Sequence, residues 1–382
     1  MSVTALDEPV LRLRERFPIF RHTTYLNSCS LGALSDRSRV ALSDYLDQWE
    51  RRGASAWYDT WLGAYERLRS GYGRIVGAEA SAIALHPCIS TALTVVAESL
   101  DYRRRPKVVT TSLDFPTVPY QWLAKAGAGV EVEILESPDG LSVPLEAFAN
   151  AIDGRTALVA TSHVFFTSGH IQDVRAIADL AHAQGALCLV DGYQGAGQVP
   201  VDVSAMDVDF YCAGGLKWLL GGPGIAFLYV RPSLIGQLEP RVAGWFGHAA
   251  PFRFDPRVLE RAVDAHRFDL GTPAVAAVYA QLAGLEVLEE AGLEWVQART
   301  RALTDDLIAD ASARGLRPKV SPEPARRSAI VMLPREQPHA DVARLAEAGF
   351  IVDARPGHVR VSPYFYNRAD EHRSFLEHLS RG

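Results

Sequence analysis

The chain has 382 residues, of which 48% are hydrophobic and 22% charged, and its formal net charge is −6. This composition predicts a globular protein with one large and one smaller domain, because the chain is too long for a single small core. The acidic balance argues against nucleic acid as a partner, and no apolar run approaches the roughly eighteen residues that a membrane span needs. We therefore expect a soluble, cytoplasmic protein that binds neither nucleic acid nor a membrane.

The amino-terminal part begins with an amphipathic segment, residues 1–20, which we expect to pack with the smaller domain. The sequence TYLNSCSLGALSD then predicts a short extended piece and a glycine turn. Ser35 or Asp36 can cap the helix that follows through ALSDYLDQWERR. The four cysteines, Cys29, Cys88, Cys188 and Cys212, are scattered, so we expect neither a metal site nor a disulfide framework.

From Tyr65 onward, apolar runs alternate with helical patterns, which predicts an α/β domain built on a mainly parallel, mixed sheet of about seven strands. The candidate strands are IALHP, KVVTT, VEVEIL, TALVATSHV, ALCLVD, DFYCAG and IAFLYV. Ligands of such sheets bind at the carboxyl ends of the strands. The residues that follow these strand ends, from Cys88 to Lys217, are therefore candidates for a site.

The carboxy-terminal part begins with a long periodic helical stretch, residues 273–311, which we expect to link the two domains. The remainder predicts a compact α+β unit that carries Arg360 on the strand HVRVSP. The expected division is a terminal segment 1–20, a large domain 21–272, and a linking helix with the small domain 273–382.

Lys217 is the strongest candidate for a reactive residue. The sequence has only four lysines, Lys107, Lys125, Lys217 and Lys319, while arginine supplies nearly all other positive charge. An amine beside apolar and glycine residues can lose its proton and form a Schiff base, which a guanidinium cannot do. Asp191 ends another apolar strand and could keep the ring nitrogen of a pyridoxal cofactor protonated.

Other strand-end residues could complete a cofactor site. Ser90 opens a helix whose N–H groups could hold a phosphate, and Phe115 and His163 could stack on a flat ring. Arg360 could bind a carboxylate through two hydrogen bonds. Each residue also has a purely structural interpretation, as a helix cap, core residue or surface ion pair, but their order along one α/β chain favours the site.

Several segments together resemble the class V aminotransferase superfamily of fold-type-I pyridoxal phosphate enzymes, and within it the kynureninases. The segments are YLNSCSLG, FPT at 115–117, SHVFFTSGHIQDV, LKWLLGGPGIAFLYV, GWFGH at 244–248, RFDLGTP and RVSPYFYN. The resemblance covers nearly the whole chain. It implies pyridoxal 5'-phosphate as the cofactor and an amino acid as the substrate.

Carried over by position, the resemblance makes Lys217 the Schiff-base lysine, Asp191 the partner of the pyridine nitrogen and Phe115 the stacking ring. It places Ile89 and Ser90 on the phosphate, with Trp245 and Thr272 completing that cup from a neighbouring subunit, which implies a homodimer. Further expected contacts are His163 and Gln194 with the cofactor, and Arg360, Ser30, Trp57 and Phe246 with the substrate.

Three positions depart from the kynureninase pattern. Leu216 stands where kynureninases have a tyrosine, and Val118 where they have an acidic residue. Gln194 is instead similar to the cysteine desulfurases, in which it contacts the ring oxygen of the cofactor. The desulfurase catalytic cysteine is missing from residues 355–360, so formation of a persulfide is not expected.

The expected activity is therefore that of a pyridoxal phosphate enzyme acting on a free α-amino acid. Kynureninase-like C–C cleavage or β/γ-elimination is the first choice, and transamination or epimerisation the second. A non-catalytic binding or regulatory protein with the same fold is the alternative from another class. A pure binder would need neither Lys217 nor Asp191.

Overall fold

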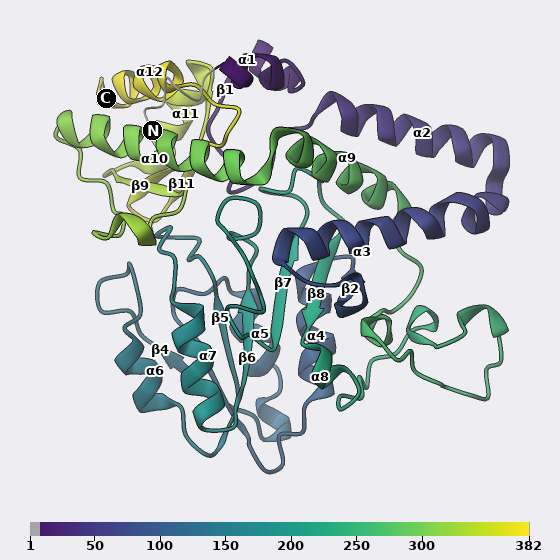
Figure 1. Ribbon diagram of the computed structural model, residues 1–382. Coiled ribbons are helices and arrows are strands. Elements are labelled where there is room, and N and C mark those ends of the chain that lie inside the picture. Colours follow the sequence, from purple (N-terminus) through teal and green to yellow (C-terminus); the bar gives the residue numbers. More distant parts are fainter. Residues whose placement is uncertain (1–7, 382) are drawn as a thin grey trace.

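A seven-stranded sheet forms the centre of the larger part of the molecule (Figure 1). The computed structural model describes residues 8–381. The strand order is β2-β8-β7-β6-β5-β3-β4, and all neighbours are parallel except β8, which is antiparallel to β2 and β7. The strands are β2 (Ile83–His86), β3 (Lys107–Thr111), β4 (Glu131–Leu135), β5 (Thr156–Ser162), β6 (Leu187–Asp191), β7 (Phe210–Gly214) and β8 (Ala226–Val230). The predicted mainly parallel, mixed sheet is confirmed.

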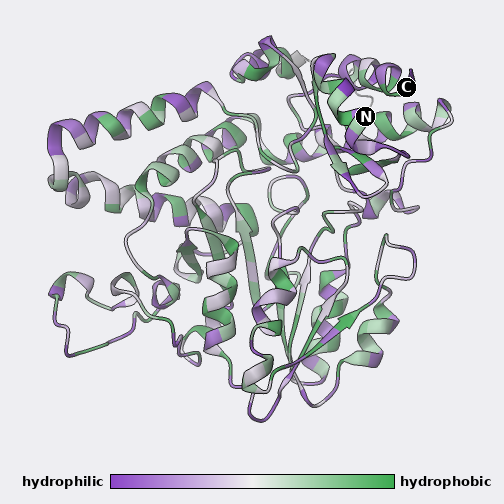
Figure 2. Ribbon diagram, turned by 180° about the vertical axis from the view of Figure 1, so that it is seen from behind, coloured by the Kyte–Doolittle hydropathy of each residue, from purple (hydrophilic) through white to green (hydrophobic). Residues whose placement is uncertain are grey.

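Both faces of this sheet are covered by helices, which explains the apolar runs of its inner strands. Leu189 packs into one core and its neighbour Val190 into the other, and the central strands are coloured as hydrophobic in Figure 2. The helices α4 (Ile89–Ser99) and α5 (Thr117–Leu123) contact one another and the sheet, as do α6 (Leu145–Ala151) and α7 (Val174–Ala183). The short α8 (Pro232–Ile235) follows β8.

A layer of three helices lies beside this body (Figure 1). It consists of α2 (Asp36–Arg52), α3 (Leu62–Val76) and α9 (Val275–Ala291), and α9 packs against both of the others. The amino end of α2 is capped by Ser35, whose Oγ accepts a hydrogen bond from Ser38 N–H at 3.0 Å. Of the two predicted caps, Ser35 is therefore the one used.

The linking helix predicted over 273–311 is two helices, which corrects the expectation of a single one. Helix α9 ends at Ala291 and α10 (Leu293–Ala313) begins two residues later. Gly292 separates them with a φ of 82°, a conformation that glycine adopts without strain. The helical spacing of apolar residues continues across Gly292, so the sequence pattern did not indicate that one helix ends there and another begins. Helix α10 packs against α12 of the smaller unit.

The smaller unit contains a three-stranded antiparallel sheet in the order β11-β12-β9. Its elements are β9 (Val331–Pro334), α11 (Pro338–Glu347), β10 (Phe350–Ile351), β11 (Asp353–Arg355), β12 (His358–Val361) and α12 (Ala369–Ser380). The amino-terminal part joins it, because β1 (Thr24–Tyr25) pairs with β10 and Arg14 of α1 (Glu8–Arg14) forms an ion pair with Glu371. Residues 1–7 of the predicted terminal segment lie outside the described residues, and the predicted domain limits stay predictions.

None of the helices between residues 8 and 381 is long and apolar enough to cross a membrane. Within the same range, no group of three or more His, Cys, Asp or Glu side chains is placed to hold a metal ion.

Candidate active site

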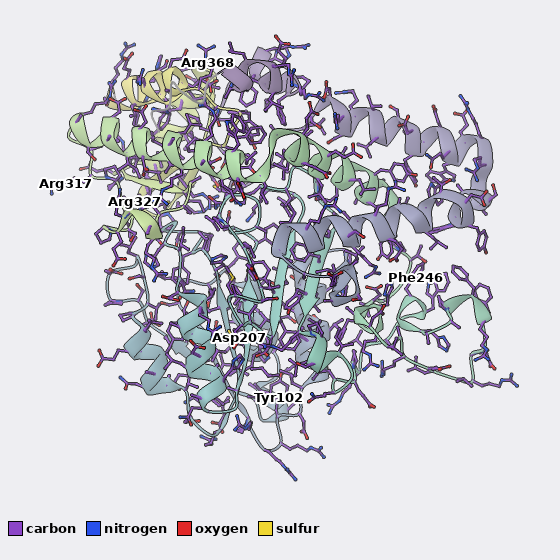
Figure 3. The ribbon with its side chains drawn as sticks, in the orientation of Figure 1. Tyr102, Asp207, Phe246, Arg317, Arg327 and Arg368 are labelled. Atoms are coloured by element: carbon purple, nitrogen blue, oxygen red, sulfur yellow. The ribbon has the colours of Figure 1, made fainter. Side chains whose placement is uncertain are left out.

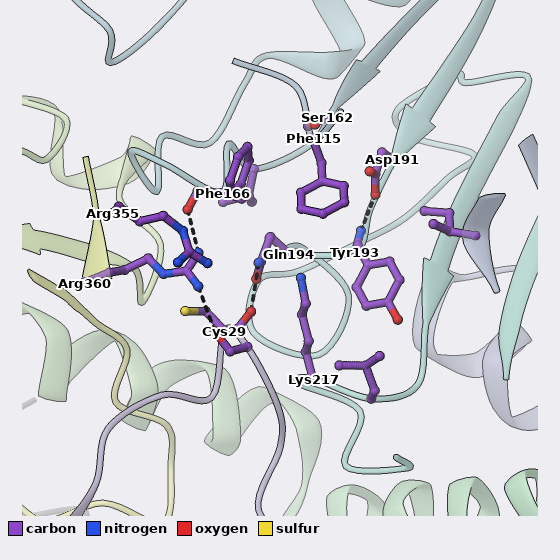
Figure 4. Close-up of a pocket in the computed structure, with 14 residues that line it drawn as sticks. Cys29, Phe115, Ser162, Phe166, Asp191, Tyr193, Gln194, Lys217, Arg355 and Arg360 are labelled. Carbon is purple, nitrogen blue, oxygen red and sulfur yellow. Dashed lines mark hydrogen bonds between the residues drawn. The ribbon is translucent and has the colours of Figure 1, made fainter. Parts of the chain in front are cut away.

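A cavity of about 400 Å³ opens at the carboxyl ends of β5, β6 and β7 (Figure 4). Its size falls in the range of ordinary small-molecule sites. Chain segments from both parts of the molecule line it: Cys29, Ser30, Ile89, Phe115, Ser162, Val164, Phe166, Asp191, Tyr193, Gln194, Leu216, Lys217, Arg355 and Arg360.

Lys217 projects into this cavity from the loop after β7. The loop is fixed from the amino-terminal part, because Gly32 N–H donates to the Leu216 carbonyl at 2.8 Å. An added Cβ at Gly32 would overlap the Lys217 carbonyl, so glycine permits this close approach. Burial lowers the pKa of the Lys217 amine to about 8, and the opposite effect of Asp191 offsets only part of that shift. A useful fraction of this amine is therefore unprotonated near neutral pH.

Asp191 ends β6 with its carboxylate buried against the same cavity. Its Oδ1 accepts a hydrogen bond from Tyr193 N–H at 2.9 Å. Burial raises the pKa of the carboxyl to about 6, although the Tyr193 N–H and Lys217 lower it. A protonated ring nitrogen would supply the positive partner that favours the ionised form. The Asp191 carboxylate at this end of the cavity therefore fits the protonated ring nitrogen of a pyridinium.

Two aromatic rings flank the Lys217 amine (Figure 4). Its Nζ lies 5.9 Å from the centre of the Phe115 ring and 4.6 Å from that of Tyr193. Asp114 fixes the Phe115 loop to β5, because it accepts hydrogen bonds from Thr111 N–H at 2.8 Å and Ser162 N–H at 2.6 Å. Gly214 leaves room for Tyr193, since an added Cβ there would overlap the phenol ring. The two rings suit a flat aromatic ligand.

The amino end of α4 offers a site for a phosphate next to these rings. Cys88 precedes the helix without a side-chain cap bond to it among the described residues, so the first N–H groups stay available. Ile89 lines the cavity, and Ser90 Oγ lies 2.6 Å from Thr117 Oγ1 at the start of α5. Helix amino ends bind anions through such N–H groups and the helix dipole. With Lys217 and Asp191, these residues fit pyridoxal phosphate.

Arg360 reaches the other side of the cavity from β12, where it is only 2% exposed. Its Nη1 donates to the Phe166 carbonyl at 3.0 Å and its Nη2 to Ser30 Oγ at 2.7 Å. Its Nε is buried without a partner among the described residues. A buried donor of this kind calls for an acceptor, which a bound carboxylate would provide.

Comparison with known proteins identifies the family. Residues 40–374 match the model of the family "Aminotransferase class-V". The chain belongs to the class V aminotransferase family. This is a family of pyridoxal phosphate enzymes, so its cofactor matches the chemistry of the cavity.

Proteins similar to this chain in sequence or fold carry names for different reactions. An uncharacterized aminotransferase, YcbU, of Bacillus subtilis (strain 168) is 34% identical over 96% of each chain. A kynureninase of Pseudomonas fluorescens is 30% identical over 92% of this chain and 87% of its own. A solved structure of the cystine C–S lyase C-DES with cysteine persulfide has a TM-score of 0.88 at 21% identity, covering 95% of this chain and 99% of that one. The family is therefore established, and the reaction is not.

Most of the class V site residues expected from the sequence meet in the cavity. Seven line it: Ser30, Ile89, Phe115, Asp191, Gln194, Lys217 and Arg360. Gln194 is held within the protein, because its Nε2 donates to the Cys29 carbonyl at 3.0 Å and its Oε1 accepts from Trp218 Nε1 at 2.8 Å. Ser90 stands beside Ile89 on the first turn of α4. The functional roles of all these residues stay predictions.

The expected stacking of His163 on a cofactor ring needs correction. His163 is buried behind the cavity, with its Nδ1 3.2 Å from Tyr211 Oη. Because side chains alternate along this extended segment, Ser162 and Val164 face the cavity and His163 faces away. Tyr193 stands near the Lys217 amine instead.

Four expected residues lie outside the cavity of a single chain. Trp57 packs on Trp61 with ring centres 5.1 Å apart. Phe246 belongs to the segment that extends from the body in Figure 3, and its ring is buried against Tyr65. Trp245 is 40% exposed on the same segment, and Thr272 is exposed shortly before α9. The structure of one chain therefore brings none of these four to the cavity.

Several residues that line the cavity were not predicted from the sequence, namely Cys29, Ser162, Val164, Tyr193 and Arg355. A signal existed for Tyr193, which stands between the two assigned residues Asp191 and Gln194. No such signal existed for Arg355, which pairs with His358 in the β11–β12 hairpin. Of the three departures, Leu216 lines the cavity together with Gln194, whereas Val118 is fully buried in the core beside α4.

Proposed function

We propose that the protein is a pyridoxal phosphate enzyme that acts on a free α-amino acid by breaking a bond at the β or γ carbon. The observation that supports it most is the presence of the Lys217 amine, the Asp191 carboxylate and the Arg360 guanidinium in one cavity. Burial lowers the pKa of Lys217 and raises the pKa of Asp191, and shifts of this kind are typical of catalytic groups.

In this proposal each residue has a distinct task. Pyridoxal phosphate, when bound, supplies an aldehyde for the amine of the substrate and a ring that takes up the electron pair left at the α-carbon. Lys217 holds the cofactor and then accepts the α-proton on its Nζ. Asp191 keeps a proton on the ring nitrogen, and Arg360 binds the α-carboxylate. Phe115 and Tyr193, which lie on either side of the Lys217 amine, would contact the aromatic ring of the cofactor.

Kynureninase-like C–C cleavage or β/γ-elimination is the first candidate reaction. It is supported by the motifs shared with kynureninases and by the relative of that name. Leu216, which occupies the position of a kynureninase tyrosine, can neither donate a hydrogen bond to a phosphate nor carry a proton. This change favours a reaction other than kynurenine hydrolysis within the same class.

Transamination is the second candidate, and the relative named an aminotransferase favours it. It would need the same proton acceptor, Lys217, to return the proton to the cofactor instead of releasing a group from the substrate. Epimerisation would return that proton to the opposite face of the α-carbon.

The test is a panel of amino acids given to the cofactor-loaded protein, with the products identified. Alanine together with an aromatic acid indicates C–C cleavage, and ammonia with pyruvate or another keto acid indicates elimination. A keto acid without free ammonia indicates transamination, and a change of optical rotation alone indicates epimerisation. A protein whose absorbance no amino acid changes would fit the non-catalytic alternative and overturn the proposal.

We also propose that two copies form the active unit. Residues 241–263 extend away from the body (Figure 1), and this segment exposes Trp245, Phe254 at 68% and Val263 at 88%. Such apolar exposure is typical of an interaction surface. Light scattering is expected to give twice the mass of one chain. The Val263→Glu variant is expected to give a lower mass, because a charge replaces an apolar side chain on this surface. Leu145→Glu, on α6, serves as the control. A monomeric unsubstituted protein would contradict the proposal.

The rate of cofactor attachment is expected to depend on pH through Lys217. Only the unprotonated amine reacts with an aldehyde, so the rate should rise as the pH passes the Lys217 pKa of about 8 and level off above it. Mixing apo-protein with pyridoxal phosphate at a series of pH values and following the absorbance measures this rate. A rate that does not change across this range would show that another group controls attachment.

A further inference from the structure

Two arginines on one hairpin share a single carboxylate beside the cavity. Asp353 and Arg355 lie on β11 and Arg360 on β12, and Asp353 pairs with Arg360 in the strand register. Asp353 Oδ2 lies 2.7 Å from Arg360 Nη2 and 2.8 Å from Arg355 Nη1. It also accepts a hydrogen bond from Ser30 Oγ at 3.0 Å. Figure 4 shows both guanidinium groups on the side of the cavity away from Asp191.

One nitrogen of this group, Arg360 Nε, makes no hydrogen bond to the described residues. Arg360 has bonds from Nη1 to the Phe166 carbonyl and from Nη2 to Ser30 and Asp353, while its buried Nε has no partner among the described residues. Arg355 lines the same cavity with its side chain 28% exposed, and its Nη1 also donates to the Ala354 carbonyl at 2.7 Å. An unpaired guanidinium donor beside a buried site is complementary to a carboxylate.

The net charge of Arg355, Arg360 and Asp353 is enough to neutralise one substrate carboxylate and not a second one. Burial would raise the pKa of the Asp353 carboxyl, but Arg360, Arg355 and the Ser30 hydroxyl hold it below its ordinary value. Asp353 is therefore ionised at neutral pH, and the two guanidinium groups with one carboxylate leave one positive charge. The α-carboxylate of an amino acid neutralises it. A second carboxylate would bring an uncompensated negative charge into a partly buried site, which is costly.

Among the described residues of one chain, the rest of the cavity lining provides no cation besides Lys217 for a side-chain acid. Lys217 lies opposite Asp191 and is engaged with the cofactor in the proposed function. The remaining walls near the arginines include Val164 and Phe166, which are apolar. An uncharged side chain is thus compatible with this lining, whereas an acidic one is not.

We propose that Asp353 sets the charge selectivity of the cavity, so that the substrate is an α-amino acid with an uncharged side chain. Arg360 and Arg355 bind its α-carboxylate. Asp353 neutralises one of the two guanidinium charges, so no positive charge is left to pair with a second carboxylate on the substrate. Asp353 is a specificity-determining residue and takes no part in proton transfer. This inference rests on the proposed function, because it requires an amino acid bound at the cofactor.

The test compares amino acids of nearly equal shape and different charge. Asparagine with aspartate and glutamine with glutamate are titrated into the cofactor-loaded protein, and the change in cofactor absorbance gives each dissociation constant. The unsubstituted protein is expected to bind the amide more tightly than the acid. Asp353→Asn removes the charge at constant shape and should move the ratio toward the acid by at least about tenfold. Asp179→Asn, in an exposed pair with Arg175, should leave the ratio unchanged.

A second variant separates charge from loss of structure. Arg355→Gln removes a positive charge at a partly exposed position, so it should move the ratio further toward the amide, opposite to Asp353→Asn. An equal loss of affinity for both members of a pair, or shifts of the same sign in the two variants, would overturn the role of Asp353. A spectrum that no amino acid changes would overturn the proposed function itself, so the two failures are distinguishable.

Discussion

Lys217→Ala is expected to lose turnover by about 10³-fold or more and to lose the covalent link to the cofactor. The reason is that one amine carries both the attachment and the proton transfer. Of the four lysines, Lys217 is the one that lines the cavity, and its pKa is lowered to about 8. The measurement is the absorbance of the cofactor-loaded variant, together with the rate of product formation from whichever amino acid the panel identifies.

Lys125→Ala provides the matched control for this experiment. Lys125 forms an ion pair with Glu98 away from the cavity, so its loss should leave both absorbance and turnover unchanged. A Lys217→Ala protein that keeps the covalent link and ordinary turnover would remove the basis of the proposed function.

Asp191→Asn is expected to lower turnover by about 10²- to 10³-fold while leaving the cofactor attached to Lys217. The amide has the shape of the carboxylate but no charge, so it cannot hold a proton on the ring nitrogen. Without that proton, the electron pair left at the α-carbon is less stabilised. Stopped-flow absorbance separates the two effects, because attachment should persist while the reaction with the amino acid slows.

Asp191→Glu keeps the charge and should recover part of the lost rate, although its longer side chain shifts the oxygen. Asp179→Asn serves as a surface control for the loss of a carboxylate. Equal rates for Asp191→Asn and the unsubstituted protein would mean that Asp191 acts only as a structural residue, through its bond to Tyr193 N–H.

The sequence predicted the large sheet well because most of its strands are buried on both faces; the edge strand β4 is the largely exposed one. Each of the seven apolar runs corresponds to a strand, from Ile83–His86 to Ala226–Val230. The break at Gly292 escaped prediction, because one glycine in a periodic pattern is compatible with either one helix or two. The pairing of Thr24–Tyr25 with Phe350–Ile351 also escaped, since strands of two residues leave no period to detect.

The candidate site was predictable where a residue ends a strand of the main sheet. Asp191 ends β6 and Lys217 follows β7, and these strands are parallel neighbours, so the topology brings the two residues together. Asp353 and Arg355 were not predicted, because the contact of Asp353 with Ser30 and the place of Arg355 at the cavity depend on how the two parts of the molecule pack. Trp245 and Thr272 belong to a surface that one chain leaves exposed, so their expected role at the phosphate depends on a second copy.

The central claim is that Lys217 carries the cofactor. Borohydride reduction of the cofactor-loaded protein fixes the link irreversibly, and mass spectrometry of its peptides locates the modified lysine. The predicted result is modification of Lys217 alone among Lys107, Lys125, Lys217 and Lys319. Modification at another lysine, or none at all after incubation with pyridoxal phosphate, would contradict the claim.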